Sequence, residues 1–314
     1  MTVNETKDKL IVLLGPTATG KTRLAVRLAK ALRTSIVSGD SMLVYRGFNI
    51  GSAKPGETER DGIHHALIDC LDPAKDSFNV AEFQRLAAEE IHTVNQNGSI
   101  PILAGGTGLY VKALLEGYRF NKNQEDREYR ALLENLAEKH GKAYIHKMLE
   151  RVDPQSATRL HVNDFRRVVR ALEVWHLGQE KISREKEDGC LVYDACVIGL
   201  RLDRQMLYER IEKRVDKMVA AGLEDEVRQL LHVGVPRNSR AMQGIGYKEM
   251  LAYIDGNLSL AEAIKNIKKA TRHFAKRQFT WYRKMPYIHW FNIEAISFEA
   301  LVDAVLAAVN HKFM

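Results

Sequence analysis

One eight-residue segment near the amino end restricts the fold of this chain more than any other feature. Residues 15–22 read GPTATGKT, a complete G-x-x-x-x-G-K-[ST] phosphate-binding loop. The apolar run Leu10–Leu14 precedes it, and a helical stripe of apolar residues follows it at Leu24, Ala25, Leu28, Ala29 and Leu32. In this context backbone N–H groups and a helix N-terminus converge on an anion, while Lys21 adds charge and the Thr22 hydroxyl suits Mg²⁺. The segment predicts that the chain binds a polyphosphate.

Further apolar segments predict a P-loop type of α/β fold with a parallel sheet flanked by helices. Strand candidates occur at residues 10–14, 35–38, 99–104 and 195–200, and they alternate with helical stretches. The carboxyl ends of parallel strands share one edge of the sheet, which is where ligands bind. Asp40 and Thr107 follow two of these strands, so both are expected near the phosphate loop.

The strand signals stop between about residues 120 and 194, which predicts an inserted all-helical subdomain. Its charged helices are expected at residues 126–140, 144–151 and 164–177. The last has Asn163 as a candidate N-cap and directs three arginines outward, Arg166, Arg167 and Arg170. The predicted domains are therefore a core of residues 1–119 and 195–314 and a helical insertion of residues 120–194. Further core helices are expected at residues 204–233, 260–283 and 298–309.

Composition is that of an ordinary globular protein. The 314 residues contain 45% hydrophobic and 28% charged side chains, and no apolar run approaches the roughly 18 residues that a membrane-spanning helix needs. The amino end lacks the apolar region of a signal peptide, so we expect a cytoplasmic protein without a membrane partner. The three cysteines have no metal-binding spacing and are expected to be reduced. Nothing in the sequence requires more than a monomer.

The positive charge is concentrated in one segment. The net charge is +7, yet residues 265–284 alone contain eight Lys or Arg and no Asp or Glu. Basic residues recur there at helical spacing, opposite a predicted core-facing stripe of Ile264, Ile267, Phe274 and Trp281. Such concentration is typical of a surface that binds a polyanion, although a solvated basic helix has the same pattern.

A P-loop kinase or ATPase needs a second carboxylate for Mg²⁺ at a strand end. The candidates are Asp40 and Asp69, and neither follows a long apolar run. The segment Gly105-Gly-Thr-Gly108 is more unusual, because its three glycines would let the backbone approach a ligand beside the Thr107 hydroxyl. The residues alone leave open a nucleotide-dependent small-molecule kinase, an RNA-binding ATPase and an enzyme that uses the loop in another way.

Six strings together resemble the bacterial tRNA dimethylallyltransferases. They are Gly15-Pro-Thr-Ala-Thr-Gly-Lys-Thr22, Asp40-Ser-Met-Leu-Val-Tyr45, Ile50-Gly-Ser-Ala-Lys-Pro55, Gly105-Gly-Thr-Gly-Leu-Tyr110, Met242-Gln-Gly-Ile-Gly-Tyr247 and Lys276-Arg-Gln-Phe-Thr-Trp281. The resemblance covers nearly the whole chain, and the family carries a helical insertion at the same place. Two positions depart from it, with Leu43 where many members have Gln and Asn49 where Asp is frequent.

The resemblance implies a prenyl transfer. The N6 amine of the adenosine next to the tRNA anticodon attacks C1 of dimethylallyl diphosphate and releases diphosphate. Asp40 is then the general base and Thr107 bonds the bridging oxygen, while Arg214, one helical turn from Arg210, contacts the diphosphate. Mg²⁺ is the expected cofactor, on Thr22. The implied diphosphate site comprises Gly15, Thr17, Ala18, Thr19, Gly20, Lys21, Thr22, Arg210 and Arg214.

The implied partners are the anticodon stem-loop of tRNA and dimethylallyl diphosphate. A stacked adenine must be extruded before it can react, which demands a separate grip on the RNA. The residues assigned to tRNA are Asp40, Ser41, Met42, Leu43, Arg166, Arg167, Arg170, Gln243, Gly244, Gly246, Tyr247, Lys268, Lys269, Arg272, Lys276, Arg277 and Gln278.

Overall fold

The computed structural model describes residues 7–75, 78–118, 120, 126–178 and 190–313. Its contacts divide the chain into two compact units, a larger one of residues 1–115 and 191–314 and a smaller one of residues 116–190. Residue 119, at the boundary expected from the sequence, lies outside the described residues. Among the described residues, no helix combines the length and apolar character that crossing a membrane requires.

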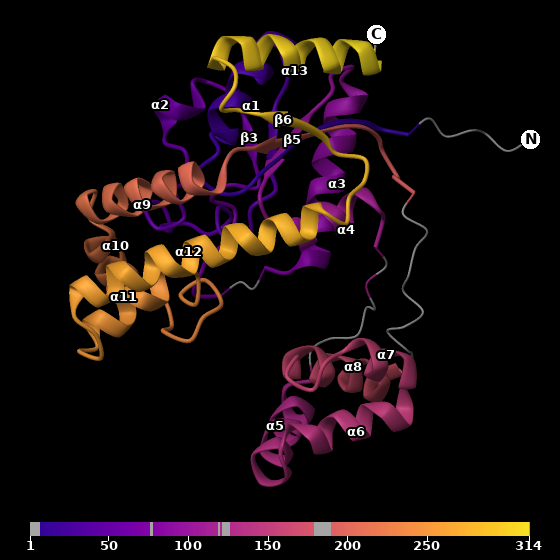
Figure 1. The fold of residues 1–314 in the computed structure, drawn as a ribbon, viewed down its shortest axis with the longest axis vertical. Helices are drawn as coiled ribbons and strands as arrows, with labels where there is room; N and C mark the ends of the chain where they lie inside the picture. Colours follow the sequence, from indigo (N-terminus) through magenta and orange to yellow (C-terminus); the bar gives the residue numbers. More distant parts are fainter. Residues whose placement is uncertain (1–6, 76–77, 119, 121–125, 179–189, 314) are drawn as a thin grey trace, which may run out of the picture. The chain divides into compact units, whose positions relative to one another are not determined.

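The larger unit is built on a six-stranded sheet in which all pairings are parallel (Figure 1). The strand order is β3-β2-β4-β1-β5-β6, so the predicted parallel α/β fold is confirmed. The strands are β1 (Lys9–Leu14), β2 (Ile36–Ser38), β3 (His65–Ala66), β4 (Ile102–Gly105), β5 (Asp194–Arg201) and β6 (His289–Asn292). The sequence analysis missed β3 and β6 because these edge strands have only two and four residues, which is too short for a clear strand signal.

Strand β1 shows why helices cover both faces of the sheet. Leu10, Val12 and Leu14 belong to one apolar core, whereas Ile11 and Leu13 belong to the other, and all five are fully buried. The second core is closed by α1 (Lys21–Leu32) and α13 (Phe298–Phe313). The first is closed in part by α3 (Val80–Gln96) and α4 (Gly108–Leu115). Period-two alternation with both faces buried is what a central parallel strand requires.

The larger unit also contains further helices. They are α2 (Glu57–Arg60), α9 (Arg204–Ala220), α10 (Leu223–His232), α11 (Tyr247–Ile254) and α12 (Leu260–Tyr282). The single helix expected over residues 204–233 is wrong, because the chain breaks between α9 and α10 at Gly222. That residue has φ +94°, a backbone conformation that glycine adopts without steric cost.

The buried face of α12 differs from the predicted one. Its buried residues are Ala263, Ile267, Ala275, Gln278 and Tyr282. Of the predicted apolar stripe only Ile267 is fully buried, while Ile264, Phe274 and Trp281 are half-buried. The carboxyl half of the helix is therefore rotated from the expected register, and Gln278, assigned to the RNA face, points into the protein.

The smaller unit consists of α5 (Arg127–His140), α6 (Lys142–Val152), α7 (Pro154–Arg159) and α8 (Phe165–Gly178), packed around a separate core. Two expectations for α8 are wrong. Asp164, not Asn163, supplies the carbonyl that accepts the first helical hydrogen bonds. Arg170 does not face outward with Arg166 and Arg167, because it is half-buried and paired with the fully buried Glu173, which also binds Arg130. A buried carboxylate needs such cationic partners.

Candidate active site at the carboxyl edge of the sheet

Residues from four segments meet at the edge where β1, β2 and β4 end. The phosphate loop follows β1, Asp40 follows β2, Thr107 follows β4, and Arg214 reaches them from α9. Lys21 and Arg214 both act to lower the pKa of Asp40, and Asp40 acts to raise the pKa of each of them, so the three groups lie close together. The parallel pairing of β1, β2 and β4 explains this convergence, since it brings their carboxyl ends to one side.

The phosphate loop has the backbone geometry of an anion-binding turn. Ala18 has φ +66° and Gly20 has φ +83°, and Gly20 stands directly before the first residue of α1, Lys21. Successive N–H groups of such a turn point inward toward a common centre. Gly15 at its start leaves no room for a side chain, because a Cβ there would lie 2.9 Å from the Leu200 carbonyl oxygen.

Inside the loop, polar groups converge on the peptide unit between Pro16 and Thr17. The Pro16 carbonyl accepts hydrogen bonds from Lys21 Nζ and from Thr19 Oγ1, both at 2.8 Å. The Thr17 N–H donates to Gln278 Oε1 at 3.0 Å. The Thr17 amide, which the sequence assigned to the diphosphate, therefore has a protein partner, and the amides of residues 18–22 remain for an anion.

Burial disfavours the charged forms of both basic groups beside the loop, and a bound anion would stabilise those charged forms. Burial, reinforced by the nearby Arg214 charge, lowers the pKa of Lys21 to about 7, against the opposing effect of Asp40. Burial also lowers the pKa of Arg214. Arg210, one turn away on α9, is exposed. Desolvated cations with an incomplete set of counter-charges form an anion site, and Arg214 contributes to it in a way that Arg210 does not.

Asp40 is the carboxylate that belongs to this site. Its Oδ1 accepts a hydrogen bond from the Met42 N–H at 2.8 Å, which turns the chain sharply after β2. Burial raises the pKa of Asp40, and this effect exceeds the opposing influence of the Met42 bond and of Lys21. The other candidate, Asp69, is paired with Lys54 and lies beside β3. Asp69 has no influence on the pKa of Lys21 or Arg214, whereas Asp40 influences both.

Thr107 lies beside Asp40 across the sheet edge. Its Oγ1 accepts a hydrogen bond from the Ser41 N–H at 3.3 Å, and its carbonyl accepts the first bonds of α4. The Thr107 hydroxyl hydrogen can still be donated to a ligand. The ends of β2 and β4 are thereby joined through Thr107 and Ser41, the residue that follows Asp40.

The glycines around Thr107 lie against other parts of the protein. An added Cβ would lie 2.5 Å from the Gly39 backbone at Gly105, 2.3 Å from Gln278 Nε2 at Gly106 and 2.4 Å from Trp281 Cβ at Gly108. These separations are far below normal contact distances. The glycines admit neighbouring protein, chiefly α12, and their expected role of letting the backbone approach a ligand stays a prediction.

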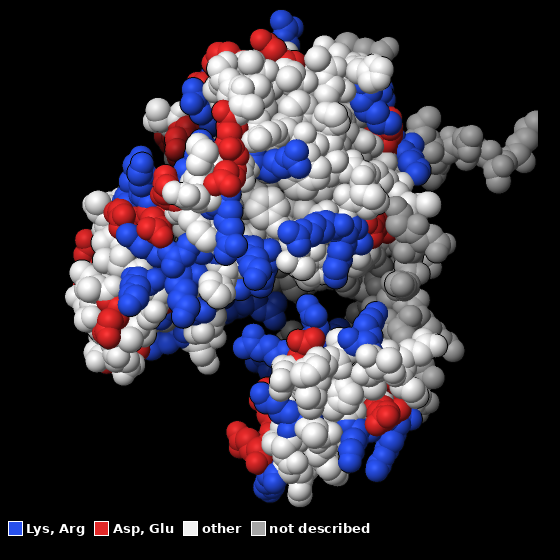
Figure 2. Space-filling model, viewed as in Figure 1, with Lys and Arg blue, Asp and Glu red and all other residues white. Residues whose placement is uncertain are grey.

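Several residues assigned to RNA on α12 are exposed on one face. Figure 2 shows Lys and Arg side chains gathered on the larger unit over α9 and α12. Lys268 pairs with Asp216 at 2.6 Å and Arg272 pairs with Glu212 at 2.6 Å, so these two are tied to α9. The exposed members of this basic face are Lys265, Lys269, Lys276 and Arg277.

The sequence missed Glu226, which fixes the loop after Phe48. Its carboxylate accepts hydrogen bonds from the N–H groups of Asn49, Ile50 and Gly51, and Tyr247 Oη donates to it at 2.7 Å. Tyr247, assigned to RNA, is instead fully buried. An acidic residue four positions beyond a helix-breaking glycine was the only sequence signal for this role.

The other residues assigned to RNA around this loop vary in exposure. Gln243 is exposed and Gly246 is buried before α11, where its N–H donates to Glu249 Oε2. Gly244 packs on Met42, since a Cβ there would lie 2.8 Å from Met42 Cε. Ser41, Met42 and Leu43 are half-buried directly after Asp40.

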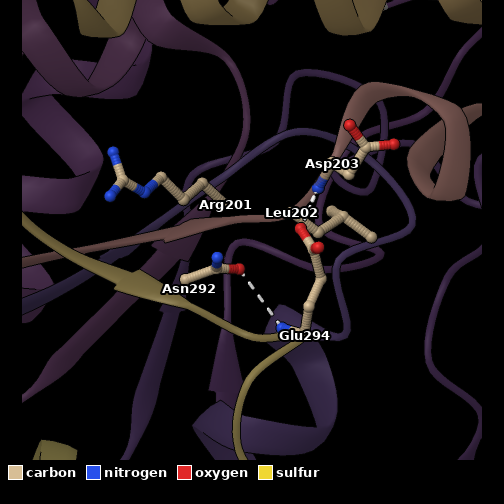
Figure 3. Close-up of a pocket in the computed structure, with 5 residues that line it drawn as sticks. All are labelled: Arg201, Leu202, Asp203, Asn292 and Glu294. Carbon is tan, nitrogen blue, oxygen red and sulfur yellow. Dashed lines mark hydrogen bonds between the residues drawn. The ribbon is translucent and has the colours of Figure 1, made fainter.

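A shallow hollow of about 350 Å³ lies at the ends of β5 and β6 (Figure 3). It is lined by Arg201, Leu202, Asp203, Asn292 and Glu294, and Glu294 accepts a hydrogen bond from the Asp203 N–H. Figure 3 shows the Arg201 guanidinium directed away from Glu294. Two carboxylates at this hollow disfavour an anion, so it is unsuited to a diphosphate.

Known proteins resemble this chain over most of its length. Residues 43–285 match the family model described as IPP transferase. A tRNA dimethylallyltransferase of Bacillus cytotoxicus is 48% identical over 289 residues, which cover 91% of each chain. A tRNA dimethylallyltransferase of Bacillus mycoides is 47% identical, over 91% of this chain and 90% of its own.

Solved structures agree with this relationship. The tRNA isopentenylpyrophosphate transferase of Bacillus halodurans is 42% identical, with a TM-score of 0.74, and the match covers 98% of this chain and 97% of that one. A eukaryotic dimethylallyltransferase, described as acting on tRNA, is 28% identical with a TM-score of 0.78, over 91% of this chain and 74% of that one. On sequence and structure together, the chain belongs to the IPP transferase family.

Proposed function

We propose that this protein transfers a dimethylallyl group from dimethylallyl diphosphate to N6 of the adenosine immediately 3′ of the anticodon in tRNA, releasing diphosphate. The observation that carries the proposal is the convergence of Lys21, Arg214 and Asp40 at a phosphate loop. Two desolvated cations suit a leaving group that gains negative charge, and the carboxylate suits an amine that loses a proton. The relatives are named for transfer to tRNA and give no support to a kinase.

The phosphate loop would hold the departing group. As N6 donates its electron pair to C1, the C1–O bond breaks and its electrons pass to the bridging oxygen of the diphosphate. Donors that already point at this charge stabilise the transition state. The loop amides of residues 18–22, Lys21 and Arg214 are such donors, and the Thr107 hydroxyl would bond the bridging oxygen.

Asp40 would accept the proton that N6 loses. Because burial raises its pKa, the carboxylate is a stronger base than an exposed aspartate, while the neighbouring cations keep the ionised form accessible. Its short turn, held by the Met42 N–H, fixes the carboxylate at the strand end. Proton transfer to Asp40 leaves a neutral secondary amine as product.

Mg²⁺ fits the donor chemistry of this site. The described residues contain no cluster of three or more His, Cys, Asp or Glu able to hold a metal by itself. Mg²⁺ in phosphate sites relies on substrate oxygens, waters and one or two protein oxygens. The exposed Thr22 hydroxyl, in the first turn of α1, would hold the ion, which would neutralise part of the diphosphate charge.

The RNA-binding surface would be the basic face of α12, which consists of Lys265, Lys269, Lys276 and Arg277. Arg166 and Arg167 of α8 would be further phosphate contacts. These side chains are exposed and would position the anticodon stem-loop without reading its sequence. Gln243 and residues 41–43 would meet the extruded base. We propose that the protein acts as a monomer in the cytoplasm, where its tRNA substrate resides.

One assay separates the candidate functions. The protein would be incubated with dimethylallyl diphosphate, Mg²⁺ and unmodified tRNA, and the RNA digested to nucleosides for mass spectrometry. Isopentenyladenosine at the position after the anticodon is the expected product. Its absence, with ATP consumed instead in the presence of a small acceptor, would replace the proposal by a kinase, and RNA-stimulated ATP hydrolysis without nucleoside modification would indicate an ATPase.

A further inference from the structure

We propose that Gln278 is a positioning residue for the transfer, and that with Tyr282 it sets the spacing between the phosphate loop and Thr107. The inference rests on the proposed function. It replaces the RNA contact expected of Gln278, whose side chain is almost completely buried at 3% exposure. Neither residue touches the reacting atoms in this proposal, and both act through the backbone of the two segments that do.

The Gln278 amide bridges the two segments directly. Its Oε1 accepts from the Thr17 N–H at 3.0 Å, and its Nε2 donates to the Gly106 carbonyl oxygen at 2.8 Å. One end of the amide thus holds the phosphate loop and the other holds the end of β4. An amide suits this task because it offers an acceptor and a donor on one planar group.

Tyr282, one helical turn further along α12, makes a second bridge between the same segments. Its hydroxyl lies 3.0 Å from the Gly15 carbonyl oxygen and 3.1 Å from the Gly106 carbonyl oxygen, and its single proton is shared between them. Tyr282 is buried at 1% exposure. Two side chains one turn apart on the same helix therefore bridge the phosphate loop and the end of β4. Together they define the distance between these two segments.

Peptide planarity carries this constraint to the reactive side chains. The Thr17 N–H belongs to the same planar unit as the Pro16 carbonyl, which holds Lys21 Nζ. The Gly106 carbonyl belongs to the same planar unit as the Thr107 N–H, directly before the Thr107 side chain. Fixing these two peptide planes fixes the directions from which Lys21 and Thr107 approach a shared ligand.

The close packing of α12 shows that the bridge tolerates little movement. A Cβ at Gly106 would lie 2.3 Å from Gln278 Nε2, so even one methyl group would displace the amide. The same helix is paired with α9 through Arg272 with Glu212 and Lys268 with Asp216, on either side of Arg214. Helix α12 therefore positions three parts of the diphosphate site, namely the phosphate loop, the end of β4 and helix α9. The same helix carries the basic face.

The test compares Gln278→Met and Tyr282→Phe with wild type. Both changes keep most of the side-chain volume and remove the bridging hydrogen bonds. We expect kcat for prenyl transfer to fall by about 10²-fold, as misplacement of catalytic groups by about 1 Å does. The KM for tRNA should stay within about twofold, because the basic face of α12 is unaltered, and amide hydrogen exchange over residues 15–20 and 105–108 should accelerate.

Gln84→Met is the matched control. Gln84 is half-buried on α3 and likewise donates from Nε2 to a backbone carbonyl, that of Ala113, at 3.3 Å. It should lose some stability and keep wild-type kcat. If Gln278→Met keeps wild-type kcat, or if Gln84→Met loses as much activity at a similar loss of melting temperature, the inference is overturned.

Tyr282→Phe decides the matter if Gln278→Met does not fold. Hydrogen exchange also separates the inference from the proposed function. A wild-type protein without transfer activity would refute the function, whereas unchanged exchange at both segments in an active protein would refute the bridge alone.

Discussion

Lys21 Nζ donates a hydrogen bond to the Pro16 carbonyl oxygen, 2.8 Å away within its own phosphate loop. The ammonium group is thus folded onto the backbone, and burial lowers its pKa to about 7. A group in this condition is half-charged near neutral pH. A bound polyanion would favour the charged form, so ligand binding and protonation of Lys21 should be linked.

Diphosphate binding should therefore take up protons near pH 8. In the free protein Lys21 is then mostly neutral, and the ligand raises its pKa again, so a proton is drawn from the buffer. Isothermal titration with inorganic diphosphate and Mg²⁺ in two buffers of different ionisation enthalpy measures the uptake. Lys21→Met should abolish this contribution, and equal apparent enthalpies in both buffers for wild type would contradict the linkage.

Lys21 should also lower the free energy of unfolding, because its pKa is lower in the folded protein than in the unfolded chain. Between pH 7 and 10.5 the unfolded chain binds more protons at this lysine than the folded one, so its contribution to stability rises with pH. Below about pH 7 the folded state bears the full cost of the buried charge. Urea unfolding should show that Lys21→Met equals or exceeds wild type in stability at pH 7, with a smaller gain toward pH 9.5. The exposed variant Lys269→Met should follow wild type at both pH values.

Asp40→Asn should abolish transfer and leave the Kd for tRNA within about twofold, because phosphate contacts supply most of the RNA affinity. In the wild type, the rate should rise with pH through the raised pKa of Asp40, since only the ionised carboxylate accepts a proton. Single-turnover rates from pH 4.5 to 8 measure this limb. A loss of tRNA affinity as large as the loss of rate would contradict the role of Asp40 as base.

The exposed basic face should determine the salt dependence of RNA binding. Lys269→Gln, Lys276→Gln and Arg277→Gln combined should lower the slope of log K against log salt by about 3, roughly one for each phosphate that is no longer neutralised. The matched control is Lys7→Gln with Lys139→Gln and Lys147→Gln, which are exposed lysines outside α12. Filter binding of tRNA at several salt concentrations measures both, and equal slopes for the two triple variants would show that α12 presents a solvated surface only.

Tyr247→Phe should loosen the loop that follows Phe48. The variant removes the hydroxyl that donates to Glu226 at 2.7 Å and accepts from the Ser52 N–H at 3.0 Å. Loss of a buried hydrogen bond to a carboxylate is expected to lower the free energy of unfolding by about 1–3 kcal/mol. Urea denaturation measures it, with the half-exposed Tyr144→Phe as control. A change below about 0.5 kcal/mol would mean that Glu226 holds the loop without the phenol.

The sequence determined four of the six strands of the sheet and the position of the phosphate loop, for local reasons. The run Leu10–Leu14, the glycines and Lys21 follow one another without interruption, and strand, turn and helix signals act over a few residues. The proximity of Asp40 and Thr107 to the loop also followed, because parallel strands bring their carboxyl ends to one edge. The tRNA substrate class came from resemblance, and the relatives agree with it.

Only the tertiary structure decided which side chains on α12 face inward. Sequence spacing cannot distinguish a polar residue on the solvent face from one that replaces a core residue, and Gln278 was therefore assigned to RNA. Its burial depends on two backbone groups, from Thr17 and Gly106, that lie far away in the chain. Arg170 with Glu173 and Tyr247 with Glu226 were missed for the same reason. A buried polar group is stable only when its partners are present, and those partners are assembled by folding, not by neighbouring sequence.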